Sequence, residues 1–226
     1  MERILQEGLR RLGLDSGEAV IAQFLTYYEL LVSYNKKVNL TAITAPEEVA
    51  VKHFLDSVAL LALFDLPRGA RVVDVGTGAG FPGLPLKIVR PDIDLTLVDA
   101  LGKRVTFLRM CADTLGLTQV TCLHARAEEL GKKAEHREQY DVAVSRAVAN
   151  LATLSEYCLP LVRLGGTFAA LKGPAAPQEL SGAKNAIAVL GGGNACIKLA
   201  EIADAELKHA VVLVDKIGHT PPKYPR

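Results

Sequence analysis

The sequence Val72-Val73-Asp74-Val75-Gly76-Thr77-Gly78-Ala79-Gly80 joins a short apolar segment directly to a glycine-rich turn. Branched residues such as Val72, Val73 and Val75 favour a strand that is buried on both faces. The three glycines let the backbone turn sharply and leave no Cβ to obstruct a ligand at the start of the next helix. We therefore predict the first strand and the first nucleotide-binding turn of a doubly wound α/β sheet.

The spacing of the glycines argues against two common nucleotide ligands. The dinucleotide fingerprint G-x-G-x-x-G/A, counted from Gly76, places its last position on Phe81, which is too large for close helix–strand packing. A phosphate-binding loop needs Lys and then Ser or Thr after its last glycine, whereas Gly83 is followed by Leu84 and Pro85. NAD and ATP are thus disfavoured. An acidic residue two positions before a G-x-G-x-G turn resembles the first motif of the class I methyltransferases, which bind S-adenosylmethionine. The alternative is a turn whose glycines serve packing alone.

Composition limits the class of protein. The chain has 226 residues, half of them hydrophobic, which suffices for a substantial core in one domain with a small appendage. The formal net charge of +1 provides no bulk attraction to nucleic acid or membrane. A polyanion must therefore be held by a local basic patch.

The cysteines and the first residues indicate the compartment. No C-x-x-C pair occurs, which argues against zinc and against a disulfide framework; the four cysteines are Cys111, Cys122, Cys158 and Cys196. The first residues are acidic where a signal peptide is cationic, and no apolar run approaches membrane-spanning length. We expect a cytoplasmic protein with free thiols, no metal and no membrane segment.

The first third of the chain is expected to be helical. Apolar residues recur at three- and four-residue steps over residues 17–38, and Asp15 or Ser16 is the expected cap. A second helix is expected to begin with a capping box at Thr44 and to run towards Phe64. A Leu-Pro-Arg-Gly link then breaks the helix. We accordingly divide the chain into an N-terminal helical cap, 1–67, and a sheet domain, 68–226.

Polar residues in this helical part have both a structural and a functional interpretation. Lys36 and Lys37 suit a solvated helix end, where positive charge complements the helix dipole, and their functional interpretation is contact with phosphate. His53 and Asp56 are three residues apart and share a helix face, so they form a structural polar pair or part of a site. Two such residues are too few to indicate a metal.

After the glycine turn, residues 81–89 predict a crossover helix and residues 95–99 a second strand. Asp99 ends that strand close to the spacing of about twenty residues at which a dinucleotide fold places an acidic group on ribose hydroxyls. A carboxylate suits that position because two vicinal hydroxyls can both donate to it. The alternative is a cap for the next helix. That helix begins with Gly102-Lys103-Arg104, whose two cations are candidates to contact a phosphate backbone.

The third and fourth strands are expected at residues 119–123 and 140–144. The loop after the third strand crosses the ligand-binding edge of such a sheet, so Ala127 and Glu128 are placed to meet the adenine. The fourth strand ends at Ser145-Arg146-Ala147, where methyltransferases of exocyclic amines resemble one another in an Asn- or Asp-Pro-Pro-Tyr segment and those of pyrimidine carbon use Pro-Cys. Neither sequence is present. Arg146 instead offers a planar cation that suits a carboxylate or a phosphate.

The remaining residues predict alternating helices and strands. Helices are expected at 151–163 and 177–190, a fifth strand ending at 171–173, and closing strands near 195–202 and 207–215. The whole pattern predicts an α/β fold of the class I methyltransferase (Rossmann-like) type, a doubly wound, mostly parallel seven-stranded sheet with an antiparallel edge and an N-terminal helical extension.

Seven segments together resemble the RsmG (GidB) family of ribosomal RNA small subunit methyltransferases. They cover nearly the whole chain in the family's order, and six of them lie outside the glycine turn that all such enzymes share. They are Asn-Lys-x-x-Asn-Leu-Thr at 35–41, His-x-x-Asp-Ser at 53–57, Asp-x-Gly-Thr-Gly-x-Gly-x-Pro-Gly at 74–83, Leu-Gly-Lys-Arg at 101–104, Ser-Arg-Ala at 145–147, Leu-Lys-Gly at 171–173 and Lys-Tyr-Pro-Arg at 223–226. Family members often extend past this last segment, so a trimmed tail is expected to weaken RNA binding.

The resemblance implies methyl transfer from S-adenosylmethionine to N7 of a guanine in the decoding-region hairpin of bacterial 16S rRNA, free or in a small-subunit particle. It also implies cofactor contacts from Gly76, Phe81, the Ala127-Glu128 pair and Arg146. The full set of expected cofactor residues is Asp74, Gly76, Gly78, Gly80, Phe81, Asp99, Ala127, Glu128 and Arg146. Candidates to position the guanine are Asn39, His53, Arg146 and Lys172. Candidates to bind RNA are Lys36, Lys37, Lys103, Arg104, Lys172, Lys223 and Arg226.

The chemistry agrees with the absence of an obvious catalytic base from the motifs. Guanine N7 has a free lone pair and no proton, so its attack on a sulfonium methyl needs no general base. The site must instead place the two reacting atoms in line at about 3–3.5 Å and exclude water. Two alternatives remain at this stage: a methyltransferase of a small molecule or protein, and a non-catalytic RNA-binding module. A monomer is the expected state.

Overall fold

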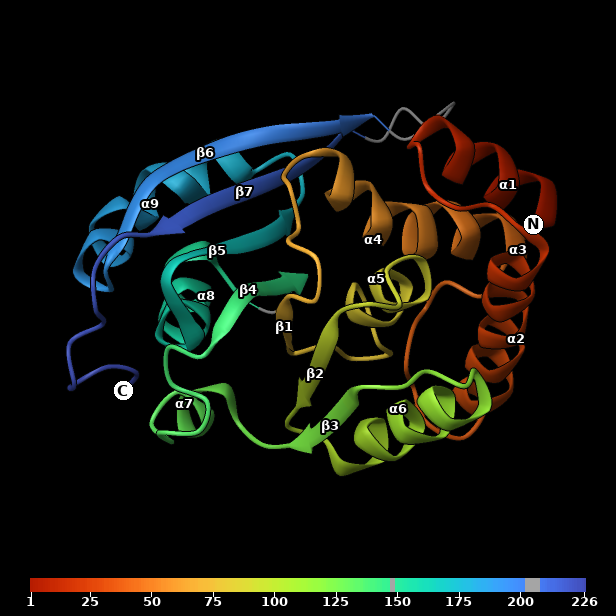
Figure 1. Ribbon diagram of the computed structural model, residues 1–226, viewed down its shortest axis with the longest axis horizontal. Coiled ribbons are helices and arrows are strands. Elements are labelled where there is room, and N and C mark those ends of the chain that lie inside the picture. The colour runs from red at the N-terminus through yellow and green to blue at the C-terminus, as the bar shows by residue number, and fades with distance from the viewer. Residues whose placement is uncertain (147–148, 202–207) are drawn as a thin grey trace.

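The computed structural model describes residues 1–146, 149–201 and 208–226. Its centre is one sheet whose strands lie in the order β3-β2-β1-β4-β5-β7-β6 (Figure 1). The strand bounds are β1 Arg71–Val75, β2 Asp94–Asp99, β3 Val120–His124, β4 Tyr140–Arg146, β5 Val162–Lys172, β6 Gly192–Glu201 and β7 Lys208–Lys216.

The pairing confirms the predicted fold class. Strands β3, β2, β1, β4 and β5 run parallel to one another, and β7 is antiparallel to both β5 and β6. The strand order reverses beside β1, so the carboxyl ends of β1 and β4 border the crevice in which doubly wound folds bind ligands. The ends of the two closing strands predicted at Ile202 and Leu207 lie outside the described residues.

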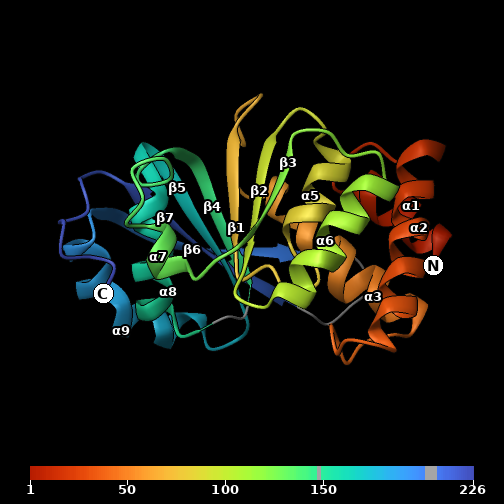
Figure 2. The same cartoon turned by 90° about the horizontal axis from the view of Figure 1, so that it is seen from below.

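Helices cover both faces of the sheet (Figure 2). Helices α1, α2, α3, α5 and α6 lie on one side and α7, α8 and α9 on the other, as a doubly wound sheet requires. Their bounds are α1 Glu2–Arg11, α2 Glu18–Asn35, α3 Pro46–Val49, α4 Asp56–Ala59, α5 Gly83–Val89, α6 Gly102–Thr114, α7 Ala127–Leu130, α8 Leu151–Cys158 and α9 Ala176–Val189. A π-helical segment (η1, Ala50–Leu55) and two 3-10 turns (η2, Leu60–Ala62; η3, Leu159–Leu161) complete the list.

The helical predictions need four corrections. The expected cap by Asp15 or Ser16 is wrong, because the N-cap of α2 is Gly17 and no side chain caps the helix. The predicted capping box at Thr44 is wrong, because the N-cap of α3 is Ala45 and no side chain caps it. The predicted helix over 151–163 ends at Cys158, and its last two residues begin β5. The predicted second helix is interrupted by η1, whose wider turn carries His53.

The helical extension shares its core with the sheet. One continuous cluster of buried side chains contains Leu5 of α1 and Phe24 of α2 together with Leu84 of α5 and Phe107 of α6. Aromatic contacts cross the same junction, since the rings of Tyr34 and Phe107 lie 5.1 Å apart. The first helices therefore bury one face of the sheet layer.

Candidate functional site

The glycine turn after β1 has the backbone that glycine permits. Gly76, Gly78 and Gly80 have φ values of 70°, 61° and 101°, in the left-handed region that side chains rarely adopt. A Cβ on Gly80 would lie 2.5 Å from a Leu84 methyl and 2.6 Å from the Tyr27 hydroxyl. The glycines are thus required by the turn itself, whether or not a ligand binds.

Asp74 supports this turn from inside the protein. Its Oδ2 accepts hydrogen bonds from the Thr77 hydroxyl (2.6 Å) and the Gly83 amide (2.8 Å), and the side chain is fully buried. Burial raises the pKa of the Asp74 carboxyl to about 7. The other carboxylate oxygen is buried without a hydrogen-bond partner among the described residues. Asp74 therefore fixes the turn from beneath.

Asp99 presents a carboxylate at the end of β2. Its Oδ2 accepts from the Gly78 amide and its Oδ1 from the Leu101 amide, both at 2.9 Å. Arg104 approaches Oδ2 at 3.5 Å. A carboxylate oxygen has two lone pairs, so Oδ1 can accept one further donor while it holds Leu101, and Oδ2 can do so where the donor takes the place of the long Arg104 contact.

A pocket opens beside Asp99 at the carboxyl edge of the sheet. It is lined by Val75, Gly76, Val98, Asp99, Ala100, Ala125, Arg126, Ala127, Glu128 and Tyr157. Four residues expected at the cofactor, Gly76, Asp99, Ala127 and Glu128, therefore come together here. Gly78 adjoins the pocket through its bond to Asp99. Sequence reasoning missed Tyr157 of α8, because nothing in the sequence indicates that α8 packs against α7.

A second pocket lies at the end of β4. It is lined by Lys52, His53, Asp56, Arg146, Leu171, Lys172 and Gly173. Three of the four candidates for positioning a guanine, His53, Arg146 and Lys172, thus meet in one place. Since β4 pairs with β1, this pocket adjoins the edge that carries the glycine turn.

Arg146 is held by groups of the helical extension. Its Nη1 donates to the Lys52 carbonyl (3.1 Å) and to Asp56 Oδ2 (2.9 Å), and its Nη2 lies 3.2 Å from His53 Nδ1. The guanidinium carbon lies 4.9 Å from the centre of the Phe81 ring. His53 and Asp56 thus share Arg146 as a partner.

His53 has polar partners at both ring nitrogens. Its Nδ1 lies 3.2 Å from Arg146 Nη2, which can only donate, and 3.2 Å from the Lys52 carbonyl, which can only accept, and its Nε2 lies 2.9 Å from the Thr41 hydroxyl. Burial and the neighbouring Arg146 lower the pKa of His53 to about 4. The imidazole is therefore neutral at physiological pH.

Phe81 connects His53 to Tyr27 through stacked rings. It stacks on His53 with ring centres 4.6 Å apart and on Tyr27 at 5.5 Å. The Tyr27 hydroxyl donates to the Ala79 carbonyl within the glycine turn at 2.5 Å. Sequence reasoning did not single out Tyr27 and so missed this contact.

Lys172 is buried in ionic contacts. Its Nζ lies 2.8 Å from Glu179 and donates to the Ala149 carbonyl at 2.5 Å, and its side chain is 6% exposed. Glu179 also accepts from the Leu151 amide at 2.8 Å. Lys172 therefore joins the beginnings of α8 and α9.

The loop between α2 and α3 carries Lys36, Lys37 and Asn39, all exposed. Asn35 shapes this loop, because its Oδ1 accepts from the amides of Leu40 (2.7 Å) and Thr41 (3.0 Å) and its Nδ2 donates to the Thr41 carbonyl (3.0 Å). Asn35 stands in the first family segment, but its role becomes visible only when the loop is seen.

The other RNA candidates differ in accessibility. Lys103 is exposed at the start of α6, whereas Arg104 is directed to Asp99. Lys223 is exposed, and the guanidinium of Arg226 pairs with Glu156 at 2.9 Å. Ala147 of the Ser-Arg-Ala segment lies outside the described residues. Ser145 was not expected in the site, yet its hydroxyl donates to the Val75 carbonyl at 2.7 Å and joins the ends of β4 and β1.

Neither a metal centre nor a membrane span is found among the described residues. Within residues 1–146, 149–201 and 208–226, no three His, Cys, Asp or Glu side chains gather in a way that would hold a metal ion. Over those ranges, too, every helix is too short or too polar to cross a membrane.

Comparison with known proteins identifies the family. The GidB family model, described as rRNA small subunit methyltransferase G, matches residues 20–207. The chain is 47% identical to ribosomal RNA small subunit methyltransferase G of Clostridium botulinum and 48% identical to that of Alkaliphilus metalliredigens, each over 99% of this chain and 93% of the relative. A SAM-dependent O-methyltransferase of Thermotoga maritima shares the fold, with a TM-score of 0.56 and 14% identity over 84% of this chain and 72% of that chain. The chain therefore belongs to the GidB family of rRNA small subunit methyltransferases G.

Proposed function

We propose that this protein transfers the methyl group of S-adenosylmethionine to N7 of a guanine in the decoding-region hairpin of bacterial 16S rRNA. One observation carries the proposal: a pocket with an Asp99 carboxylate beside the glycine turn adjoins a second pocket around Arg146, on neighbouring strand ends. A donor in the first pocket and an acceptor in the second meet at the carboxyl edge of the sheet.

Each pocket residue has a role that suits this reaction. Asp99 accepts the ribose hydroxyls, the bare backbone of Gly76 and Gly78 admits the methionyl part, and Ala127 with Glu128 borders the adenine. Asp74 acts indirectly by fixing the turn. The cofactor supplies an electrophilic methyl group on a sulfonium.

The second pocket positions the guanine without moving a proton. Guanine N7 attacks with its lone pair, so the neutral His53 is not needed as a base. Arg146, held over Phe81, keeps a fixed positive charge at the pocket wall and offers its planar face to a base. Asn39 stays a candidate on the adjoining loop. Lys172 contributes by holding together the beginnings of α8 and α9.

The RNA backbone is proposed to cross exposed cations of the loop 36–41 and of α6. Lys36, Lys37 and Lys103 are exposed for this role, with Lys223 as a more distant contact. Arg104 is proposed to act mainly on Asp99. The substrate is 16S rRNA or its small-subunit particle, and the protein acts as a cytoplasmic monomer. The division into 1–67 and 68–226 is kept as a description of two structural layers.

Labelled methyl transfer tests the reaction. We expect transfer to 16S rRNA or its particle, and loss of one reduction-and-aniline-sensitive guanine from the rRNA of cells that lack the protein. Transfer only to a small molecule or protein would favour the first alternative activity. Cofactor-independent RNA binding without turnover would favour a non-catalytic module.

Lys103→Ala tests the RNA contact. Loss of one phosphate contact should weaken RNA binding and lower the slope of log affinity against log salt by about one, without changing cofactor affinity. The matched control is Lys184→Ala, because Lys184 is an exposed lysine of α9, which covers the other face of the sheet. Equal effects of the two substitutions would contradict an RNA surface at α6.

A further inference from the structure

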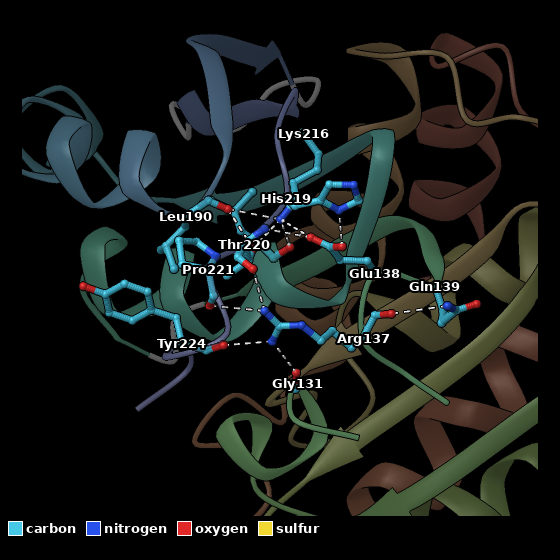
Figure 3. Close-up of polar contacts among 11 residues, drawn as sticks. Gly131, Arg137, Glu138, Gln139, Leu190, Lys216, His219, Thr220, Pro221 and Tyr224 are labelled. Atoms are coloured by element: carbon cyan, nitrogen blue, oxygen red, sulfur yellow. Dashed lines mark hydrogen bonds and ion pairs between the residues drawn. The ribbon is translucent and has the colours of Figure 1, made fainter. Parts of the chain in front are cut away.

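The last ten residues, Ile217–Arg226, form an irregular segment that is fastened to the body of the protein. We refer to it as the closing segment. It follows β7 and runs beside the loop that precedes β4 (Figure 3). Polar contacts hold both of its ends, and several come from side chains that no part of the proposed reaction uses.

Arg137 is the centre of these contacts. Its Nη1 donates to the carbonyls of Gly131 (2.9 Å) and Tyr224 (2.8 Å), and its Nη2 donates to those of Thr220 (2.7 Å) and Pro221 (3.3 Å). One guanidinium thus joins the C-cap of α7 to the beginning and the end of the closing segment (Figure 3). Only the planar, five-donor head of Arg can serve carbonyls in this arrangement.

Glu138 and Lys216 fix the beginning of the segment. Glu138 accepts from the Thr220 amide (2.8 Å) and pairs with His219 (2.6 Å) and Lys216 (3.3 Å). The Lys216 ammonium is fully buried and also donates to the carbonyls of Leu159 (2.8 Å) and Leu190 (3.1 Å).

The other end of the segment contacts α7 and α8, the helices that carry Ala127, Glu128 and Tyr157 of the Asp99 pocket. Both the amide and the guanidinium of Arg226 bond to Glu156, at 2.7 and 2.9 Å, and Glu156 precedes the pocket residue Tyr157. Pro225 packs so closely on the C-cap of α7 that a Cβ added to Gly131 would lie 3.0 Å from its ring. Tyr224 packs on the core cluster that contains Leu130 of α7.

We propose that the closing segment, clamped by Arg137, positions α7 and α8 so that Ala127, Glu128 and Tyr157 form the adenosyl side of the cofactor pocket. Arg137 and Arg226 are then positioning residues for the methyl donor. The proposal therefore assigns Arg226 to the cofactor pocket and not to RNA binding. This inference rests on the proposed function for the identity of the ligand.

Titration of S-adenosylmethionine and of its demethylated product by calorimetry tests the inference. Arg137→Ala should raise the dissociation constants of both roughly tenfold, since a loosened supporting shell weakens a pre-formed site. In steady-state assays the KM for the cofactor should rise while kcat at saturation stays close to wild type, because binding is lost equally in the ground and transition states. Arg163→Ala is the matched control, as Arg163 pairs with Asp141 where β4 and β5 begin.

Exchanging the charges of Glu156 and Arg226 gives a second test, in which restored binding in the double variant shows that the single variant had not simply unfolded. Glu156→Arg should weaken cofactor binding by about two- to threefold, the range of an exposed ion pair, and adding Arg226→Glu should restore it. RNA affinity without cofactor should be unchanged in the double variant. If wild type does not bind the cofactor, the proposed function fails. If wild type binds and the Arg137 and Glu156 variants bind equally well, the positioning role is wrong; if the double variant loses RNA affinity, Arg226 is an RNA contact.

Discussion

At the scale of single residues, the site depends on side chains that hold backbone. The hydroxyls of Tyr27 and Ser145 each bond to a carbonyl beside the glycine turn, and Asp74 bonds to an amide and a hydroxyl of it. None of these groups is placed to react. They fix where the peptide lies, and so they determine how a cofactor is received.

Tyr27→Phe removes one such bond. The Ala79 carbonyl then lacks its buried donor, so we expect about 1–2 kcal/mol lower stability and a several-fold weaker cofactor affinity. Urea unfolding and calorimetry measure the two effects. Tyr28→Phe is the control, because its hydroxyl bonds to the Thr44 carbonyl in an exposed position. Equal cofactor affinities in wild type and the Tyr27 variant would show that the turn keeps its shape without this hydrogen bond from α2.

His53 makes stability depend on pH. In the unfolded chain its imidazole takes up a proton near pH 6.5, whereas burial keeps the folded pKa at about 4. At His53 the unfolded chain therefore binds more protons between these values, so the contribution of this residue to stability falls as the pH drops from 6.5 to 4, by up to about 1.4 kcal/mol per pH unit. Asp74, whose pKa burial raises to about 7, contributes in the opposite sense. His53→Gln should make this dependence shallower in urea unfolding at pH 7.5 and 5, while His124→Gln should not. A wild-type pH slope in the His53→Gln variant would contradict the neutral imidazole.

At the scale of elements, the loop between α2 and α3 links RNA candidates to the reaction pocket. Asn35 orders the loop, and the Thr41 hydroxyl of the loop is hydrogen-bonded to His53, which in turn contacts Arg146. A phosphate bound at the loop would therefore lie on a short chain of contacts to the pocket that we propose for the guanine.

Asn35→Ala should uncouple this loop. Three hydrogen bonds are lost, so kcat/KM for RNA methylation is expected to fall about tenfold, with the cofactor dissociation constant within about twofold of wild type. Methyl-transfer kinetics and calorimetry check both values. A parallel loss of cofactor affinity would show that the substitution disturbs the whole fold.

The elements also show what the sequence could predict. The run of branched residues before Gly76 and the acidic end of the second strand locate β1, β2 and the cofactor edge, since burial and turn geometry are local properties. The π-helical segment around His53 and the burial of Lys172 against Glu179 were not predictable, because they depend on partners distant in sequence. Arg137 belongs to no sequence motif, and its role becomes visible only from its hydrogen bonds to four carbonyl groups.

At the scale of the whole molecule, the helical extension and the sheet layer fold around one core. Side chains of α1 and α2 pack in the same cluster as those of α5 and α6. The site draws on both layers, since Arg146 comes from β4 and its partners Lys52, His53 and Asp56 from the extension.

The sheet layer should therefore not fold when it is produced without the helical extension. A chain of residues 68–226 exposes the buried rings of Phe81 and Phe107 and lacks the partners of Arg146, so we expect it to aggregate or to lose its tertiary structure. The full chain should unfold in a single transition followed by both circular dichroism and fluorescence of its tyrosines. Two separate transitions would mean that the layers are independent domains.

The two hydrogen bonds that Asp99 accepts from backbone amides affect the entropy and the rate of ligand binding. Its carboxylate is already oriented by Gly78 and Leu101 before a ligand arrives, so the rotational entropy of that side chain is lost on folding rather than on association. A methyl donor then encounters an acceptor with its geometry already set, and association should proceed in one fast kinetic phase without a slow rearrangement.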